Sequence, residues 1–148
     1  MKKLVLFAAV LAAPFSLQAN DGQTAYQTCM ACHGADGKGM KAGPNTMAPS
    51  LAGSKLVNGN PELLAKIILK GIHKEDQKYM MVMAPLEAAY ADDQKLADVI
   101  NYVRNSFGNK NEKKVTAEDA KKYREAAKDI KAPLKRADLE KAAAKKAE

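Results

Sequence analysis

Two cysteines separated by two residues and followed at once by a histidine limit this chain more than any other feature: Cys29-Met30-Ala31-Cys32-His33. Two thiols three positions apart, on one turn of chain, reach the two vinyl groups on one edge of a porphyrin. The next residue then directs an imidazole toward the iron. A run of this form is the attachment signature of a c-type haem. The sequence therefore predicts one covalent haem c, bonded to Cys29 and Cys32, with His33 on the iron.

Other uses of the two cysteines fit the sequence less well. A disulfide that closes so short a loop stabilises a fold only slightly. A thioredoxin-like pair needs a strand before the cysteines and a βαβ pattern around them, and neither is present. A zinc site needs four ligands, and only His73 remains to join Cys29, Cys32 and His33 unless carboxylates compete.

The N-terminus has the pattern of an export signal. Two lysines at positions 2 and 3 precede an apolar run over 4–13, and a small residue, Ala19, stands at a plausible cleavage site. A membrane anchor is the alternative, but the run is shorter than the ~20 residues that a span requires. Residues 1–19 are therefore predicted to be a signal peptide that is cleaved near Ala19. The mature chain is expected to be soluble in the periplasm, where nucleic-acid binding is not expected.

The positive charge is concentrated near the C-terminus. The chain carries 24 basic and 17 acidic residues, for a net charge of +7. Residues 20–108 hold nine of each sign, whereas residues 109–148 hold thirteen basic and eight acidic residues. This division predicts a charge-neutral domain over 20–108 and a lysine-rich extension over 109–148. The extension either steers the protein to an acidic partner or an anionic membrane surface, or is a solvated addition for packing or solubility.

Periodicity and capping residues predict helices over most of the chain. A short helix over 22–32 leads into the cysteines, and a long loop follows over 34–59. Asn60 and Pro61 start a helix that ends at Gly71, with a buried face of Leu63, Leu64, Ile67 and Ile68. A second irregular stretch covers 72–85. The next helix runs from Asp92 to Gly108, with one apolar face: Leu96, Val99, Ile100, Val103 and Phe107.

The extension has helix signals of its own. Thr116 and Asp119 are spaced nearly as in a capping box, which predicts a helix over 117–129. Pro133 ends it, and a further helix is expected over 136–147. Large apolar residues are few, so the extension is either a thin amphipathic hairpin docked on the domain or a partly disordered arm.

Beyond the haem run, the chain resembles the class I cytochrome c family over about residues 21–108. Gly22 and Tyr26 precede the cysteines as the N-terminal helix residues of that family do. The run Pro49-Ser50-Leu51-Ala52-Gly53 matches its Pro-x-Leu-x-Gly turn, and residues 101–104 resemble its C-terminal helix. The resemblance implies an all-α cytochrome c fold, a small helical domain wrapped around one haem. It also implies that the Pro49 carbonyl accepts from the His33 imidazole and that Leu51 packs on the haem.

The same resemblance implies a methionine as the second axial ligand. Family members offer it from a loop before the last helix, and Met83-Ala84-Pro85-Leu86 fits that pattern best. Met80 and Met81 lie close enough to compete, and His73 or an open site are further alternatives. Histidine and methionine on one iron raise its reduction potential.

With both axial positions filled by protein, no position remains for a substrate. The sequence therefore predicts a monomeric electron carrier, not an enzyme, which exchanges electrons with redox partner proteins as donor and acceptor. One alternative is a haem c subunit of a larger respiratory or dehydrogenase complex. The others are an open-site haem enzyme or gas sensor, and a non-haem metal or thiol protein.

Overall fold

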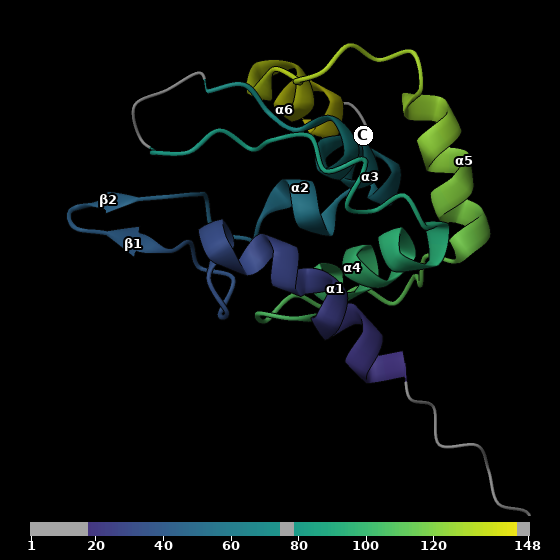
Figure 1. Ribbon diagram of the computed structural model, residues 1–148, viewed down its shortest axis with the longest axis horizontal. Coiled ribbons are helices and arrows are strands. Elements are labelled where there is room, and N and C mark those ends of the chain that lie inside the picture. The colour runs from purple at the N-terminus through teal and green to yellow at the C-terminus, as the bar shows by residue number, and fades with distance from the viewer. Residues whose placement is uncertain (1–17, 75–78, 145–148) are drawn as a thin grey trace, which may run out of the picture.

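The computed structural model of the protein describes residues 18–74 and 79–144. The predicted signal peptide lies almost entirely outside these residues. The described part is mainly helical, which confirms the all-α fold class (Figure 1). In chain order its elements are α1 (Gln18–His33), β1 (Lys41–Ala42), β2 (Asn45–Thr46), α2 (Lys55–Asn58), α3 (Pro61–Lys70), α4 (Asp93–Asn105), α5 (Ala117–Ala127) and α6 (Arg136–Ala144).

Helices α1 and α4 pack against each other through a glycine and three aromatic rings. A Cβ added at Gly22 would lie 3.0 Å from the Tyr102 Cβ, so the missing side chain lets the two helices approach closely. The Tyr26 ring lies 5.2 Å from the rings of both Tyr102 and Phe107. Phe107 was expected on the last turn of the α4 helix. It instead follows the helix end, with a positive φ of 60° that turns its ring toward Tyr26.

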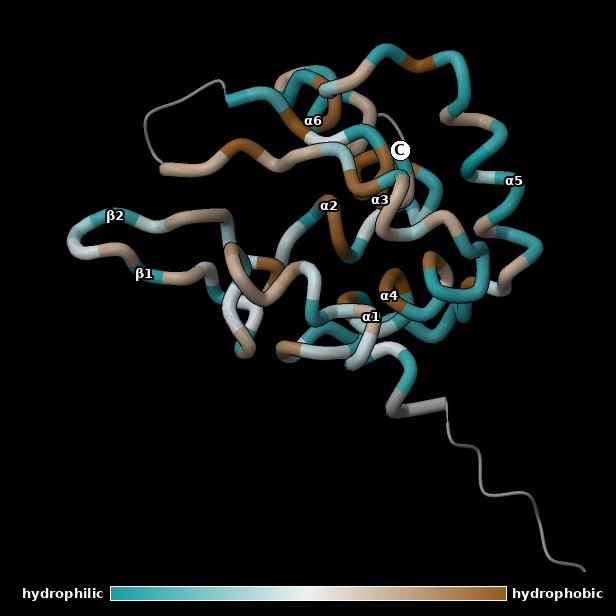
Figure 2. The backbone as a smooth tube through the Cα atoms, in the orientation of Figure 1, coloured by the Kyte–Doolittle hydropathy of each residue, from teal (hydrophilic) through white to brown (hydrophobic). Residues whose placement is uncertain are grey.

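The capping residues that the sequence indicates do begin α3 and α4. The Asn60 side chain accepts a hydrogen bond from the Glu62 amide, and the Asp92 side chain accepts one from the Lys95 amide. The buried face of α3 is wider than predicted, because Ala65 and Leu69 are completely buried while Leu63 is only partly buried. The reason is that α5 packs on α3 from a second side. Figure 2 shows the hydrophobic stretches gathered in α3 and α4 and the mainly hydrophilic α5 outside them.

The C-terminal extension is helical and packs on the rest of the chain. Thr116 and Asp119 form a complete capping box at the start of α5, which ends at Ala127, two residues earlier than predicted. Val115, Ala120 and Ala127 are buried in the same core as α1, α3 and α4. Of the two alternatives for this segment, the structure shows docking, not a partly disordered arm, but the two helices do not form the predicted hairpin: α5 packs on α3 and α4, whereas α6 packs on α2.

The predicted loop over 34–59 holds three short elements. The β1–β2 hairpin projects from the left of the molecule in Figure 1, and α2 precedes α3. Met80 and Met81 donate backbone hydrogen bonds of 3.0 and 3.1 Å to Thr46 and Met47, so the 79–86 segment lies along this hairpin. Within the described ranges, every helix is too short or too polar to cross a bilayer.

The side chain of Asn109, the first residue of the predicted extension, is buried and bonds to three segments of the chain. Its side-chain oxygen accepts from the Gly53 amide and the Asn58 side chain, both at 2.9 Å. Its side-chain nitrogen donates to the carbonyls of Leu51 and Val103 at 3.1 and 2.8 Å. The full hydrogen-bonding capacity of one amide is therefore used to join the loop after β2, helix α4 and the start of the extension.

We expect Asn109→Ala to lower the free energy of unfolding of the haem-loaded protein by about 3 kcal/mol. The change leaves buried donors and acceptors without partners, and each such group costs about 1–3 kcal/mol. Denaturant titration followed by far-UV circular dichroism measures the effect. Gln94→Ala is the matched control, because that exposed amide donates to Asp98 on its own helix. The control should change stability by less than about 0.5 kcal/mol, and an equal loss in both variants would contradict the assignment.

Candidate functional site

The haem-attachment run lies at the C-terminal end of α1. Cys29 and Cys32 are both present as free, partly buried thiols one helical turn apart, and His33 is the last residue of the helix. The Tyr90 hydroxyl donates to the Ala25 carbonyl at 2.8 Å and lies 3.4 Å from the Cys29 Sγ. Tyr90 thus fixes the last turns of α1 from the segment before α4.

Burial keeps the thiol and the imidazole of this run in their uncharged forms. Desolvation raises the pKa of Cys29, with the Tyr90 hydroxyl acting in the opposite direction. Desolvation also lowers the pKa of His33, although its hydrogen bond to the Pro49 carbonyl opposes the shift. A neutral imidazole is the form that ligates a metal ion.

The orientation of the His33 ring follows from one hydrogen bond. Its Nδ1 lies 3.0 Å from the Pro49 carbonyl oxygen. A carbonyl only accepts, so Nδ1 carries the proton and the free lone pair is on Nε2. Hydrogen bonding of the far nitrogen fixes the tautomer and raises the basicity of the ligating one. The sequence resemblance implied this same pair of residues.

A cavity of about 230 Å³ lies between the end of α1 and the segment over 72–86. Cys29, Cys32 and His33 line it from the α1 side, together with Ala48 and Pro49. In Figure 1 the 79–86 chain runs above the β1–β2 hairpin, and α6 lies above that chain. The opposite wall is mostly apolar and consists of Ile72, His73, Lys74, Tyr79, Met81, Val82, Met83, Ala84, Leu86 and Arg136.

The three methionines considered as axial ligands differ in their surroundings. Met83 lines the cavity, is partly buried, and packs against the apolar core. Met81 also lines the cavity but is 48% exposed. Met80 is 45% exposed and is not among the described residues that line the cavity. His73 lines it with an exposed side chain. These surroundings favour Met83 over its competitors.

Leu51 and Arg136 each make contacts that the sequence did not indicate. Leu51, expected against the haem, packs on the main core, and its carbonyl accepts from Asn109. Arg136, from the extension, lines the cavity, with its guanidinium 5.9 Å from the Tyr79 ring centre. No local motif marks Arg136, because its position depends on how the extension folds back over the 72–86 segment.

These residues fit a covalently bound haem better than a bare metal ion. Within 18–74 and 79–144, no three His, Cys, Asp or Glu side chains are grouped so that they could hold a metal. The cavity instead combines two free thiols and the imidazoles of His33 and His73 with mostly apolar walls. A helical fold around such a cavity defines the class of haem c electron-transfer proteins.

Comparison with known proteins gives the same class. Residues 19–107 match the model of the cytochrome c family, and the chain belongs to that family. Its cofactor is therefore covalent haem c, and its role is electron transfer.

Three relatives are cytochrome c subunits of a quinone-dependent alcohol dehydrogenase. The chain is 33% identical over 111 residues to the subunit from Gluconobacter oxydans (strain 621H), a match that covers 72% of this chain and 22% of the relative. It is 34% identical over 105 residues to those of Gluconacetobacter polyoxogenes and Komagataeibacter europaeus, covering 69% of this chain and 22% of each relative. The matched region thus spans about a fifth of the length of these relatives.

Proposed function

We propose that this chain is an exported single-haem subunit that relays electrons inside a larger respiratory or dehydrogenase complex. When bound, haem c supplies an iron that accepts and returns one electron. The protein would hold the haem covalently through Cys29 and Cys32, and its iron through two side chains, His33 and Met83. It performs no catalysis of its own, because neither axial position is left for a substrate.

The main support for this proposal is that His33 and Met83 line the same cavity. His33 comes from the α1 side and Met83 from the 72–86 segment that faces it. A thioether is a soft ligand that favours reduced iron, so this pair suits a carrier of fairly positive potential. The mostly apolar walls act in the same direction, because a low dielectric disfavours the more highly charged oxidised iron.

The optical spectrum of the purified protein tests the site. We expect sharp α and β bands in the reduced state and a weak far-red sulfur-to-iron band in the oxidised state. The reduced protein should not bind carbon monoxide readily, since both axial positions are filled. Ready binding of carbon monoxide would favour an open-site enzyme or sensor. A colourless protein would contain no haem and would refute the proposal.

Similarity to dehydrogenase subunits favours a subunit over a free shuttle. The sequence alone predicted a free periplasmic carrier, but the three relatives are all named as cytochrome c subunits of one kind of dehydrogenase. Purification at low salt should therefore recover the protein together with a dehydrogenase or oxidase. Recovery of a small, unassociated protein under those conditions would restore the free-shuttle alternative.

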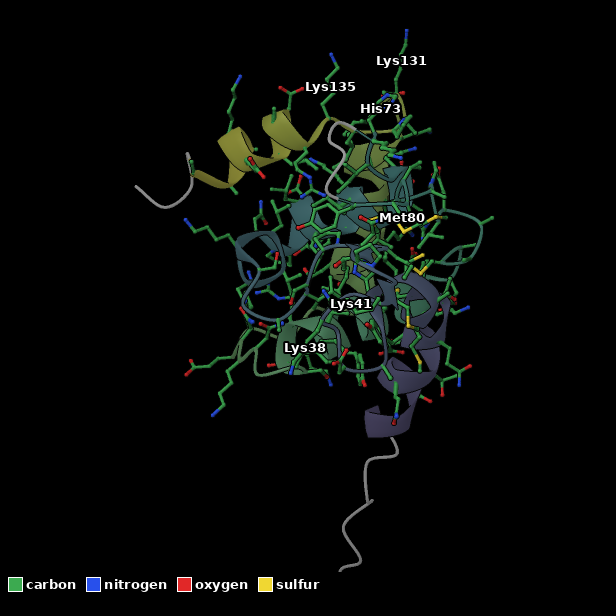
Figure 3. The ribbon with its side chains drawn as sticks, turned by 90° about the vertical axis from the view of Figure 1, so that its left-hand side faces the viewer. Lys38, Lys41, His73, Met80, Lys131 and Lys135 are labelled. Atoms are coloured by element: carbon green, nitrogen blue, oxygen red, sulfur yellow. The ribbon has the colours of Figure 1, made fainter. Side chains whose placement is uncertain are left out.

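We propose that a partner with acidic groups docks over the exposed methionines beside the cavity. Met80, Met81 and Val82 are each nearly half exposed, which is unusual for large apolar side chains. Figure 3 looks onto this face, with Lys38 and Lys41 on one side of Met80 and Lys131 and Lys135 on the other. Two of these lysines come from the extension. The positive charge of the extension would therefore steer the acidic partner toward this surface.

Reversing the charge of Lys131 and Lys135 together should slow reduction or oxidation by the partner roughly tenfold at low salt, because steering raises association rates by 10–10³. The difference should shrink as salt is added. Lys121→Glu with Lys128→Glu is the matched control, since it changes the net charge equally on and just after α5, across the molecule from the β1–β2 hairpin (Figure 1). Stopped-flow kinetics at several ionic strengths measures both pairs, and equal slowing would refute a localised surface.

We also propose that residues 1–19 are removed on export to the periplasm. On this proposal, residues 20–108 form the haem domain and residues 109–148 the extension, and the subunit is a monomer outside its complex. N-terminal sequencing of periplasmic protein should begin at Asn20. A chain that still starts at Met1 and sediments with membranes would contradict cleavage.

A further inference from the structure

The C-terminal extension and the Met83 segment share a small apolar cluster. Ile67, Ile72 and Leu139 are its buried members, and Leu56, Leu63, Met83 and Leu134 pack against it partly buried. Leu134 and Leu139 lie in the extension, outside the residues 19–107 that match the family. Residues from outside the family region therefore pack beside the proposed axial methionine.

A set of backbone hydrogen bonds links the same segments. The Ile72 amide donates to the Met83 carbonyl at 2.8 Å. The His73 amide donates to the Leu134 carbonyl at 2.8 Å, and the Leu134 amide donates to the Gly71 carbonyl at 3.0 Å. Residues 71–73 thus lie between Met83 on one side and Leu134 on the other.

The absence of a side chain at Gly71 allows this close approach. Gly71 has a positive φ of 69°, and a Cβ there would collide with the Met83 carbonyl and lie 2.8 Å from the Ala84 carbonyl carbon. The 79–86 segment has no helix of its own, and Met80 to Val82 are nearly half exposed. The packing of Met83 therefore depends strongly on the 71–73 chain and on what supports that chain.

We infer that the extension is a positioning element for the axial methionine: Leu134 and Leu139 hold residues 71–73, which hold Met83 at the cavity. The inference rests on the proposed function, because it takes Met83 as the ligand. A segment that is already ordered loses less conformational freedom when its side chain binds, so the support strengthens the methionine–iron bond. Arg136, on the first turn of α6, also reaches the cavity wall, which shows that the extension touches the site itself.

The test is competition by added imidazole for the methionine position in the oxidised, full-length holoprotein. An external ligand binds only where the methionine has left the iron, so its apparent affinity follows the fraction of open protein. Leu139→Ala should raise the affinity for imidazole at least tenfold and lower the pH at which the far-red band disappears. The midpoint potential of the Leu139→Ala protein should also fall.

Val115→Ala is the matched control, because Val115 is a buried residue of the extension that pairs with Asn101 and not with the 71–73 chain. It should leave the imidazole affinity within twofold. Equal increases in both variants, or none in a folded Leu139→Ala protein, would overturn the inference. If Leu139→Ala does not yield folded protein, the imidazole affinity of Leu134→Ala is measured in its place. The same results would support or overturn the inference.

Parallel measurement of Met83→Ala separates this inference from the proposed function. If that variant loses the far-red band while Leu139→Ala keeps the imidazole affinity unchanged, only the positioning role fails. If Met83→Ala keeps the band, the ligand assignment fails and the positioning of Met83 fails with it.

Discussion

Changing Cys29 and Cys32 together to serine is expected to abolish covalent haem attachment and to leave little folded protein. Each thiol adds across one vinyl group and forms a carbon–sulfur bond that does not dissociate. A serine hydroxyl does not form this bond under the same conditions, because it is a much weaker nucleophile than a thiol. Haem that remains in the variant should be extracted by acidified acetone, whereas in the unchanged protein it should stay with the polypeptide.

The loss of fold follows from the mostly apolar walls of the cavity. Without haem, Ile72, Met83 and Leu86 would border a space that must either fill with water or collapse. Both outcomes forfeit packing that an aromatic-poor chain replaces poorly, since only 5% of its residues are aromatic. Far-UV circular dichroism should show a lower helix content than in the haem-loaded protein.

Thr28→Ala is the control for the double serine variant. Thr28 also lines the cavity and stands next to Cys29, but it has no thiol. This variant should retain covalent haem and a normal reduced spectrum. Covalent, acetone-resistant haem in the double serine variant would contradict the attachment site proposed here.

Local signals made much of this fold predictable from the sequence. The Asn60 and Asp92 caps and the capping box at Thr116 act within three residues of their partners, so a pattern in the chain is enough to find them. The haem run is local for the same reason, since its cysteines and histidine share the end of one helix.

Contacts between distant segments were not predictable in the same way. Arg104 is only 4% exposed, although arginines are rarely buried, because its guanidinium donates to the carbonyls of Val57 and Gly59 at 2.8 and 2.6 Å. Asn109 and Leu134 are similar cases, each bonded to chain more than fifty residues away. Their roles depend on which segments the tertiary fold brings together, and neither periodicity nor a motif records that.

Met83→Ala is expected to produce the largest change in the electronic properties of the site while covalent haem is retained. The thioether is lost but Cys29, Cys32 and His33 are unchanged, so the far-red band should disappear and the α band should persist. The midpoint potential should fall by on the order of 0.1–0.2 V, a fraction of the roughly 0.8 V range over which axial ligands set haem potentials. The reduced variant should bind carbon monoxide readily, because one axial position is open.

Met80→Ala and Met81→Ala decide between the neighbouring methionines. Both side chains are nearly half exposed, so their loss should leave the far-red band and the potential close to those of the unchanged protein. Met81 lines the cavity as Met83 does, but it is more exposed and is not among the residues that pack on the apolar clusters. A band that survives in Met83→Ala and vanishes in Met81→Ala would transfer the ligand role to Met81, because an iron–sulfur bond needs the thioether that was removed.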